Sequence, residues 1–436
     1  MRRSLSLCVG SLLLAAGIGS VRALAVECSY VAPLENELAA ALDPQPADSP
    51  ADALKIKSFK AESAPRRPEP VAFASAGGTP RLDVDGFFDE LNAKLRASVA
   101  GFTMQLRRDG SPIRNKSWQW ARRPNDNSLA WQNTQSMHIA SISKLITAMA
   151  IVKLLDEKKI SHDARIADYL PAHWTVGPNV KQITFANLLT HKSGFLWRED
   201  GAGSDAFCED ISYSDYRFMK SRVAKGVSSL GHFCYANMNF GLQRILIPII
   251  NGDIDRDAAV SDQEWDNKTF DAYGRYMART IFAPAHVTKA TLARPSNNAL
   301  AYNFPPTAPG WSTGKLACLA GAAGWNMSVE DVLDIMGTFR RGNTIMSETA
   351  AQKLLNDGFG IDGITPVRNG NLYSKTGYWY RMDEDGERIY QMEQSVAVFL
   401  PDGMEMAVFA NSRVASPGRL LISLVESVYR RHVSLN

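Results

Sequence analysis

The stretch from Met137 to Leu155 reads MHIASISKLITAMAIVKLL. Its apolar residues recur at the spacing of a helix rather than of a strand, at Ile142, Leu145, Ile146, Met149, Val152 and Leu155. Ser141 stands at the start of this predicted helix, and Lys144 follows one turn later on the same face. A helix N-terminus presents N–H groups and partial positive charge. A hydroxyl beside an amine at such a place is a candidate nucleophile.

The composition is that of an ordinary globular protein. The chain has 436 residues, of which 45% are hydrophobic and 21% charged, and its net charge is +3. This length suffices for one large or two small domains. So small a net charge gives no reason to expect nucleic acid or a membrane surface as a partner.

The N-terminus has the features of a secretory signal peptide over residues 1–25. Two arginines precede an apolar run from Leu5 to Val21, and Ala23-Leu-Ala25 fits a cleavage site. A membrane anchor is the alternative, but the run is short for a span and contains glycine. We therefore expect a periplasmic or secreted protein with no stable membrane span after signal removal.

The next segment, residues 26–82, is rich in Pro, Ala and Ser, which predicts a disordered leader. The folded domain is expected to occupy residues 83–436. Export places it in an oxidising compartment. The cysteines show no CxxC spacing, and a Cys208–Cys234 disulfide is the preferred pairing, with free buried thiols as the alternative.

The periodicity places strands at both ends of the domain and helices between them. A helix is expected over residues 83–98, a strand over 101–110 with a turn at Asp109-Gly110, three strands at 373–377, 395–400 and 406–410, and a closing helix over 420–433. This order predicts an α+β fold. One antiparallel sheet is built from both chain ends and flanked by helices, and a mainly helical subdomain is inserted at about residues 145–340.

Several other kinds of catalytic centre have weak support. The string Gly310-Trp-Ser-Thr-Gly314 matches the G-x-S-x-G of many hydrolases, but no apolar strand precedes it, so we expect Ser312 to lie in a loop. The seven histidines show no HxH or HExxH spacing, and we expect no metal or cofactor. No pair of carboxylates indicates a glycosidase.

Ser141-x-x-Lys144 alone is a weak motif, because a chain of this length holds about one or two by chance. Two later strings strengthen it: Tyr235-Ala-Asn237, and Lys375-Thr-Gly377 within a predicted strand. The order and wide spacing of the three make the combination specific.

With these three motifs the chain resembles the class C serine β-lactamases and their relatives among penicillin-binding proteins and esterases. The resemblance runs from about Asp83 to the C-terminus. It also includes segments 183–194, 281–284 and 321–331. It implies the β-lactamase/transpeptidase-like fold and a hydrolase that acts through an acyl-enzyme.

The resemblance implies a role for each motif residue. Ser141 is the nucleophile, and either Lys144 or Tyr235 is its base, since an adjacent ammonium stabilises a phenolate. Asn237 holds Lys144 and contacts the substrate. His191 is a landmark of the family that we expect to stabilise a loop.

On the opposite wall, Lys375, Thr376 and Gly377 bind substrate, and Lys375 orients Tyr235 and attracts a substrate carboxylate. Gly377 is expected to let a substrate lie close to the strand. The N–H groups of Ser141 and Tyr378 form the oxyanion hole. In place of the family's small residue stands Tyr378, and we expect its ring, with those of residues 379 and 380, to narrow the mouth.

The expected substrate is a small molecule or cell-wall peptide: a β-lactam, a D-amino-acid peptide or a small ester. The Lys375 motif favours a substrate carboxylate, and the rings after it disfavour a typical β-lactamase. The alternatives are a carboxylesterase of the same fold and a catalytically inactive peptidoglycan-binding domain.

Overall fold

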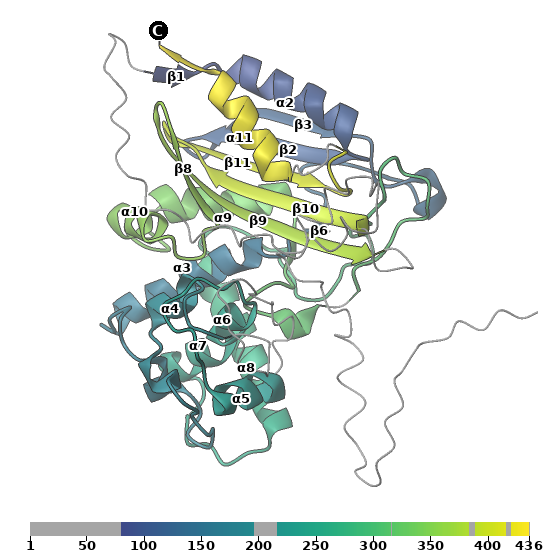
Figure 1. The fold of residues 1–436 in the computed structure, drawn as a ribbon. Coiled ribbons are helices and arrows are strands. Elements are labelled where there is room, and N and C mark those ends of the chain that lie inside the picture. The colour runs from purple at the N-terminus through teal and green to yellow at the C-terminus, as the bar shows by residue number, and fades with distance from the viewer. Residues whose placement is uncertain (1–79, 196–215, 315, 383–388, 416–419, 436) are drawn as a thin grey trace, which may run out of the picture.

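A six-stranded antiparallel sheet organises the molecule, in the strand order β3-β2-β11-β10-β9-β8 (Figure 1). This computed structural model describes residues 80–195, 216–314, 316–382, 389–415 and 420–435. The sheet strands are β2 (Phe102–Arg108), β3 (Ser111–Trp118), β8 (Gly363–Val367), β9 (Gly370–Met382), β10 (Ile389–Phe399) and β11 (Met404–Ala410). Strand β2 pairs with β11 in the middle of the sheet. The prediction of one sheet built from both ends of the chain is therefore confirmed.

Two helices cover one face of the sheet, α2 (Val84–Ser98) and α11 (Leu421–Arg431) (Figure 1). The side chain of Asp83 caps α2 by accepting from the N–H of Gly86. The apolar stripe of α2 is buried against alternate residues of the strands and against α11, where the rings of Phe87 and Tyr429 lie 5.6 Å apart. A small sheet of β1 (Pro80–Leu82) and β12 (Val433–Leu435) joins the two ends of the domain.

The other face of the sheet packs on α3 (Ile142–Glu157), α9 (Val329–Arg341) and α10 (Glu348–Asn356). Helix α3 is buried on nearly all sides. A helix that is apolar all round belongs in the core of a protein. Here the sheet lies on one side of α3 and the helical region on the other, so Ser141 stands between two layers.

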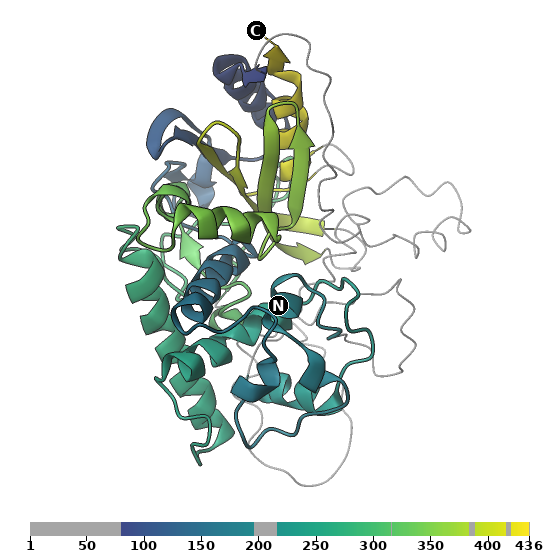
Figure 2. The ribbon, with the colours of Figure 1, turned by 90° about the vertical axis from the view of Figure 1, so that its left-hand side faces the viewer.

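The helical region is inserted between β3 and β8 and lies beyond α3 in both views (Figures 1 and 2). It contains α4 (Phe185–Leu189), α5 (Tyr216–Lys225), α6 (Met238–Gly241), α7 (Gln243–Asn251) and α8 (Asp262–Met277), which continues as a π-helix (Ala278–Phe282). The same insertion holds short strands β4 (Trp120–Arg122), β5 (Leu129–Ala130), β6 (Met137–His138) and β7 (Asn326–Met327), and 3₁₀ turns at Pro124–Asp126, Ile166–Tyr169, Val180–Gln182 and Ala317–Leu319. Among the described helices, none is long and apolar enough to cross a bilayer.

Ser141 stands at the start of its helix, as expected, although the preceding residues of the stretch quoted from Met137 are not helical. Met137 and His138 form β6, which pairs with β7, and the helix begins only at Ile142. Between them, Ala140 has a φ of 46°, in the left-handed region that turns the chain sharply. Periodicity did not reveal this turn, because the residues on both sides of it are buried.

The predicted signal peptide and most of the predicted leader lie outside the described residues. Residues 80–82, which the sequence placed in the leader, form β1 because they add a strand to β12. Cys234 and Cys318 are both in disulfides. Cys208 lies outside the described residues, so the Cys208–Cys234 pairing stays a prediction.

Candidate active site

Ser141 and Lys144 lie side by side at the N-terminus of α3. The Nζ atom of Lys144 is 2.8 Å from the hydroxyl oxygen of Ser141. Ser141 is the N-cap of the helix and is 4% exposed, and Lys144 is completely buried. The predicted pairing across one helical turn is thus present in the structure.

Two carbonyl groups fix the direction of the Lys144 amine. Its Nζ lies 2.5 Å from the side-chain oxygen of Asn237 and 3.2 Å from the backbone oxygen of Ala322. Carbonyl oxygens can only accept, so each holds one hydrogen of the amine. The same nitrogen contacts the oxygen of Ser141, where an ammonium donates a hydrogen bond and a neutral amine accepts one. Lys144 is therefore oriented for proton exchange with Ser141.

Tyr235 lies between the two lysines. The Nζ atoms of Lys144 and Lys375 are 4.7 and 5.0 Å from the centre of its ring, and Lys375 also donates to its hydroxyl at 3.3 Å. Both cations stabilise negative charge on the phenol oxygen. The Ser141–Lys144 motif and the Lys375 motif, which were expected on opposite sides of the site, therefore meet at this ring.

His191 supports Tyr235 from behind. The two rings are stacked with their centres 4.2 Å apart. The Nδ1 atom of His191 lies 3.2 Å from the N–H of Ala236 and 3.0 Å from the side-chain nitrogen of Asn239. Burial, together with the charges of Lys375 and Lys144, holds the pKa of His191 well below its usual range. A neutral ring with an acceptor at Nδ1 fits these contacts, so His191 positions the tyrosine.

On strand β9, one carboxylate binds both Lys375 and Thr376. The side chain of Asp362 accepts from the ammonium of Lys375, from the Thr376 N–H at 2.9 Å and from the Thr376 hydroxyl at 2.6 Å. The sequence analysis expected this lysine to attract a substrate carboxylate. In the structure, a carboxylate of the chain itself lies against it.

Gly377 also packs against the turn that precedes Ser141, whereas its expected role beside a substrate stays a prediction. A Cβ atom there would stand 2.3 Å from the backbone oxygen of Ile139 and 2.4 Å from the hydroxyl of Ser395. That hydroxyl donates to the same oxygen of Ile139 at 2.8 Å. The groups nearest to such a Cβ atom belong to the turn before Ser141 and to strand β10. The glycine lets β9 pack directly on the turn that precedes Ser141.

The strand geometry also orients the second predicted oxyanion donor. The Thr376 N–H points away from β10, since it donates to Asp362 beside β8. N–H groups two residues apart on a strand point to the same side, so the N–H of Tyr378 faces the same edge. With Gly377 packed on the turn before Ser141, this direction is compatible with the predicted pair of N–H donors from Ser141 and Tyr378.

The expectation of three rings at the mouth is wrong for two of them. Trp379 is 3% exposed and packs with Ala140 and Trp311, and its ring meets that of His138 edge-on. Tyr380 is 4% exposed and packs with Met392. Successive side chains on a strand point to opposite faces, and here both faces are covered. Only Tyr378 is partly exposed.

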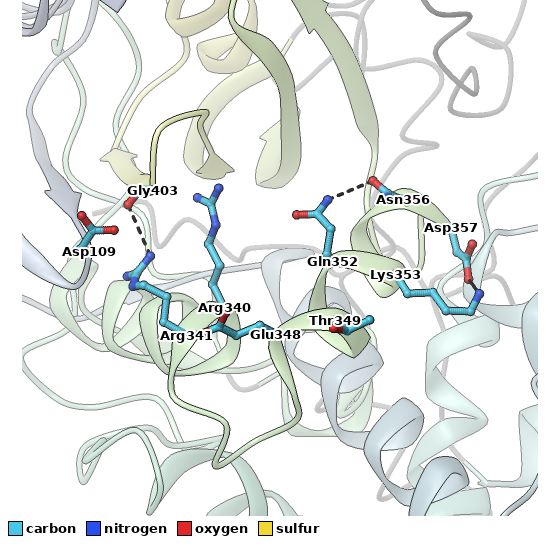
Figure 3. Close-up of a pocket in the computed structure, with 10 residues that line it drawn as sticks. All are labelled: Asp109, Arg340, Arg341, Glu348, Thr349, Gln352, Lys353, Asn356, Asp357 and Gly403. Carbon is cyan, nitrogen blue, oxygen red and sulfur yellow. Dashed lines mark hydrogen bonds and ion pairs between the residues drawn. The ribbon is translucent and has the colours of Figure 1, made fainter.

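Other candidate centres have no support. Ser312 is exposed in a stretch without a strand before it or an α-helix after it, as expected for a coincidental G-x-S-x-G. No group of metal-binding side chains occurs within the described ranges. A pocket of about 730 Å³ lies over α9 and α10 (Figure 3), but it contains no residue of the three motifs. In this pocket Lys353 pairs with Asp357, and Arg341 donates to the backbone oxygen of Gly403.

Sequence reasoning missed Asp362 and Ser395 and the stacking of His191 on Tyr235. Asp362 and Ser395 belong to no motif and contact the site through the pairing of β8 and β10 with β9. His191 was noticed as a landmark, but its contact with Tyr235 depends on the way two loops fold together.

The family model named Beta-lactamase matches residues 84–411. The chain belongs to this family. Its members are generally serine hydrolases. The match spans the sheet, α3 and the whole helical region, and so covers all three motifs.

Individual relatives are distant. The chain is 27% identical over 191 residues to a Bacillus subtilis (strain 168) protein named penicillin-binding protein PbpX, an alignment that covers 43% of this chain and only 40% of that relative. The octameric penicillin-binding protein homologue from Pyrococcus abyssi has a TM-score of 0.57 and 19% identity over 79% of this chain and 76% of its own. A class C β-lactamase from Rhodobacter sphaeroides has a TM-score of 0.52 and 17% identity, with 79% and 99% covered. The similarity to these two solved structures shows the fold alone.

Proposed function

We propose that this member of the β-lactamase family is a serine hydrolase that forms an acyl-enzyme on Ser141. The observation that supports the proposal best is the buried Lys144 amine, held by two carbonyl oxygens and directed at the Ser141 hydroxyl 2.8 Å away. A serine hydroxyl is a weak nucleophile without a base at hydrogen-bond distance. This arrangement supplies one.

The reaction follows from these contacts. The Ser141 oxygen attacks the substrate carbonyl carbon while its proton passes to the base. The N–H groups of Ser141 and Tyr378 stabilise the oxyanion that forms. Collapse of this intermediate breaks the bond to the leaving group, which takes up the proton. Water then attacks the acyl-enzyme, releasing the acid and restoring the hydroxyl.

Either Lys144 or Tyr235 accepts the serine proton. Lys144 has the direct contact with Ser141, whereas Tyr235 lies close to both lysines. Because the groups interact, their titration belongs to the set and not to one residue. Asn237 holds Lys144, and Lys375 orients the phenol.

The substrate in this proposal is a β-lactam, a D-amino-acid peptide or a small ester, and a carboxylesterase of the same fold is the second candidate. The names of the relatives favour the first two classes. The partial exposure of Tyr378 beside the site, in place of a small residue, favours the ester. We also propose export to the periplasm or beyond, on the N-terminal signal pattern.

Active-site labelling tests the proposal. The full mature chain is incubated with a fluorescent penicillin and with an aryl phosphonate, and the adduct is mapped by mass spectrometry. We expect a single adduct on Ser141, absent in S141A and retained in S312A. Labelling of Ser312, or no label with either probe, would show that the proposal is wrong. An unlabelled but folded protein would favour the inactive binding domain.

A further inference from the structure

One carboxylate occupies three converging hydrogen-bond donors beside the catalytic residues. Asp362 accepts from the ammonium of Lys375 and from both the N–H and the hydroxyl of Thr376. An ammonium, a hydroxyl and a backbone N–H that point to one place form a good binding site for a carboxylate. In this chain, Asp362 itself fills that site.

Asp362 directly precedes Gly363, the first residue of strand β8. Strand β8 pairs with β9 up to Gly363, opposite Ser374, and the N–H of Asp362 donates to the Ser374 oxygen. Past this point the edge of β9 continues as Thr376, Gly377 and Tyr378. Asp362 therefore stands at the place where a bound substrate would begin to follow the edge of β9.

The charge of Lys375 is paired within the protein. The Lys375 side chain is 1% exposed, whereas that of Asp362 is 27% exposed. A substrate approaching this edge from solvent therefore meets the carboxylate before the ammonium. A second carboxylate there would lie close to a like charge and would compete for donors that are already used.

We propose that Asp362 makes this enzyme select substrates without a carboxylate beside the scissile bond, that is, neutral esters or amides. The inference rests on the proposed acyl-enzyme function and narrows its substrate class. It reverses the expectation that the Lys375 motif favours a carboxylate. Asp362 is a specificity-determining residue whose charge, rather than its shape, is decisive.

Two matched substrates test the inference: 3-carboxyphenyl acetate and its methyl ester, which differ in the charge near the leaving group, with each kcat/KM divided by the rate constant of hydroxide-catalysed hydrolysis. We expect the wild-type kcat/KM to favour the methyl ester by about 5- to 100-fold, and added salt to reduce this preference. Asp362→Asn should raise the kcat/KM for the charged ester relative to the neutral one by a similar factor. Asp257→Asn, an exposed site between α7 and α8 with the same change of net charge, should leave the ratio unchanged.

The outcomes separate the two proposals. If Ser141 is acylated but the wild-type enzyme hydrolyses both esters equally, or prefers the charged one, the inference on Asp362 is wrong and the proposed function stands. An unchanged ratio in folded Asp362→Asn also overturns it, because a purely structural role would slow both substrates together. Failure of every probe and ester to acylate Ser141 contradicts the proposed function instead.

Discussion

The imidazole of His191 stacks on the phenol ring of Tyr235, with the two ring centres 4.2 Å apart. The edge of the same imidazole accepts from the backbone N–H of Ala236, the next residue in the motif. One side chain therefore fixes both the ring and the backbone of the Tyr235 loop.

Replacement of His191 separates these two contacts. His191→Phe keeps a ring against Tyr235 but removes the acceptor for the Ala236 N–H and for the side-chain nitrogen of Asn239, whereas His191→Ala removes both supports. We expect both variants to lose about 1–3 kcal/mol of stability and the Ala variant to lose more kcat. Thermal melts and ester kinetics check this.

Because the pKa of His191 is held well below its usual range, the pH-rate profile of His191→Phe should have the same limbs as the wild type. Loss of a limb near neutral pH would instead make His191 an acid or base of the reaction.

Loss of the Lys144 amine should remove base catalysis. Lys144→Met keeps an unbranched side chain, and we expect the acylation rate to fall by about 10²–10⁴. Lys353→Met, in the exposed part of α10, is the control and should acylate normally. Stopped-flow measurement with a chromogenic ester gives the rate constant.

If Lys144 and Tyr235 act as one unit, their effects should not add. The double variant Lys144→Met/Tyr235→Phe should then be about as slow as the slower single variant. Additive losses would mean that the two residues act independently.

Gly377→Ala should disturb the turn before Ser141. Its methyl group would overlap the Ile139 oxygen and the Ser395 hydroxyl, and the backbone must move to make room. We expect about 1–3 kcal/mol of lost stability and a loss of about 10²–10³ in rate if an oxyanion donor is displaced. Gly274→Ala, in α8 with nothing within 4 Å of the added methyl, should be neutral or slightly stabilising. An active, stable Gly377→Ala would contradict the close packing.

A buried carboxyl group on strand β10 should make the stability of the protein depend on pH. Burial raises the pKa of Glu393 to about 7, although Arg294 lies 3.8 Å away. Burial outweighs this ion pair because neither carboxylate oxygen has a hydrogen-bond partner among the described residues. The folded state therefore keeps a proton that the unfolded state loses above its ordinary pKa of 4.5. Stability from this group is complete at low pH and is lost as the pH rises through about 7.

Glu393→Gln removes that dependence. Between about pH 5 and about pH 8, the free energy of unfolding of the variant should rise relative to that of the wild type by on the order of 2 kcal/mol. Burial also lowers the pKa of His138 to about 3, and this group contributes the opposite slope below its ordinary pKa. The Nδ1 atom of His138 lies 3.8 Å from the Glu393 carboxylate, so a His138→Asn background is used for both proteins to isolate Glu393. Urea unfolding at several pH values measures the difference between the two proteins, and a constant difference would show that Glu393 is ionised throughout.

The amino-acid sequence was sufficient to predict the main helices and strands and the order of the three motifs. Periodicity predicted helix α2 and the strands at both ends of the domain, because the pattern of each element depends on residues a few positions apart. The order of these elements then predicted one sheet. The spacing of Ser141 and Lys144 predicted their contact, since one helical turn fixes it.

Apart from the Ser141–Lys144 pair, the contacts of the motif residues became known from the folded structure. Asp362 reaches Lys375 because β8 begins beside β9, and Trp379 is buried because β9 is covered on both faces. Gly377 meets Ile139 through two segments that are distant in the chain. These contacts depend on strand pairing and on the packing of layers, which the local periodicity of the sequence does not encode.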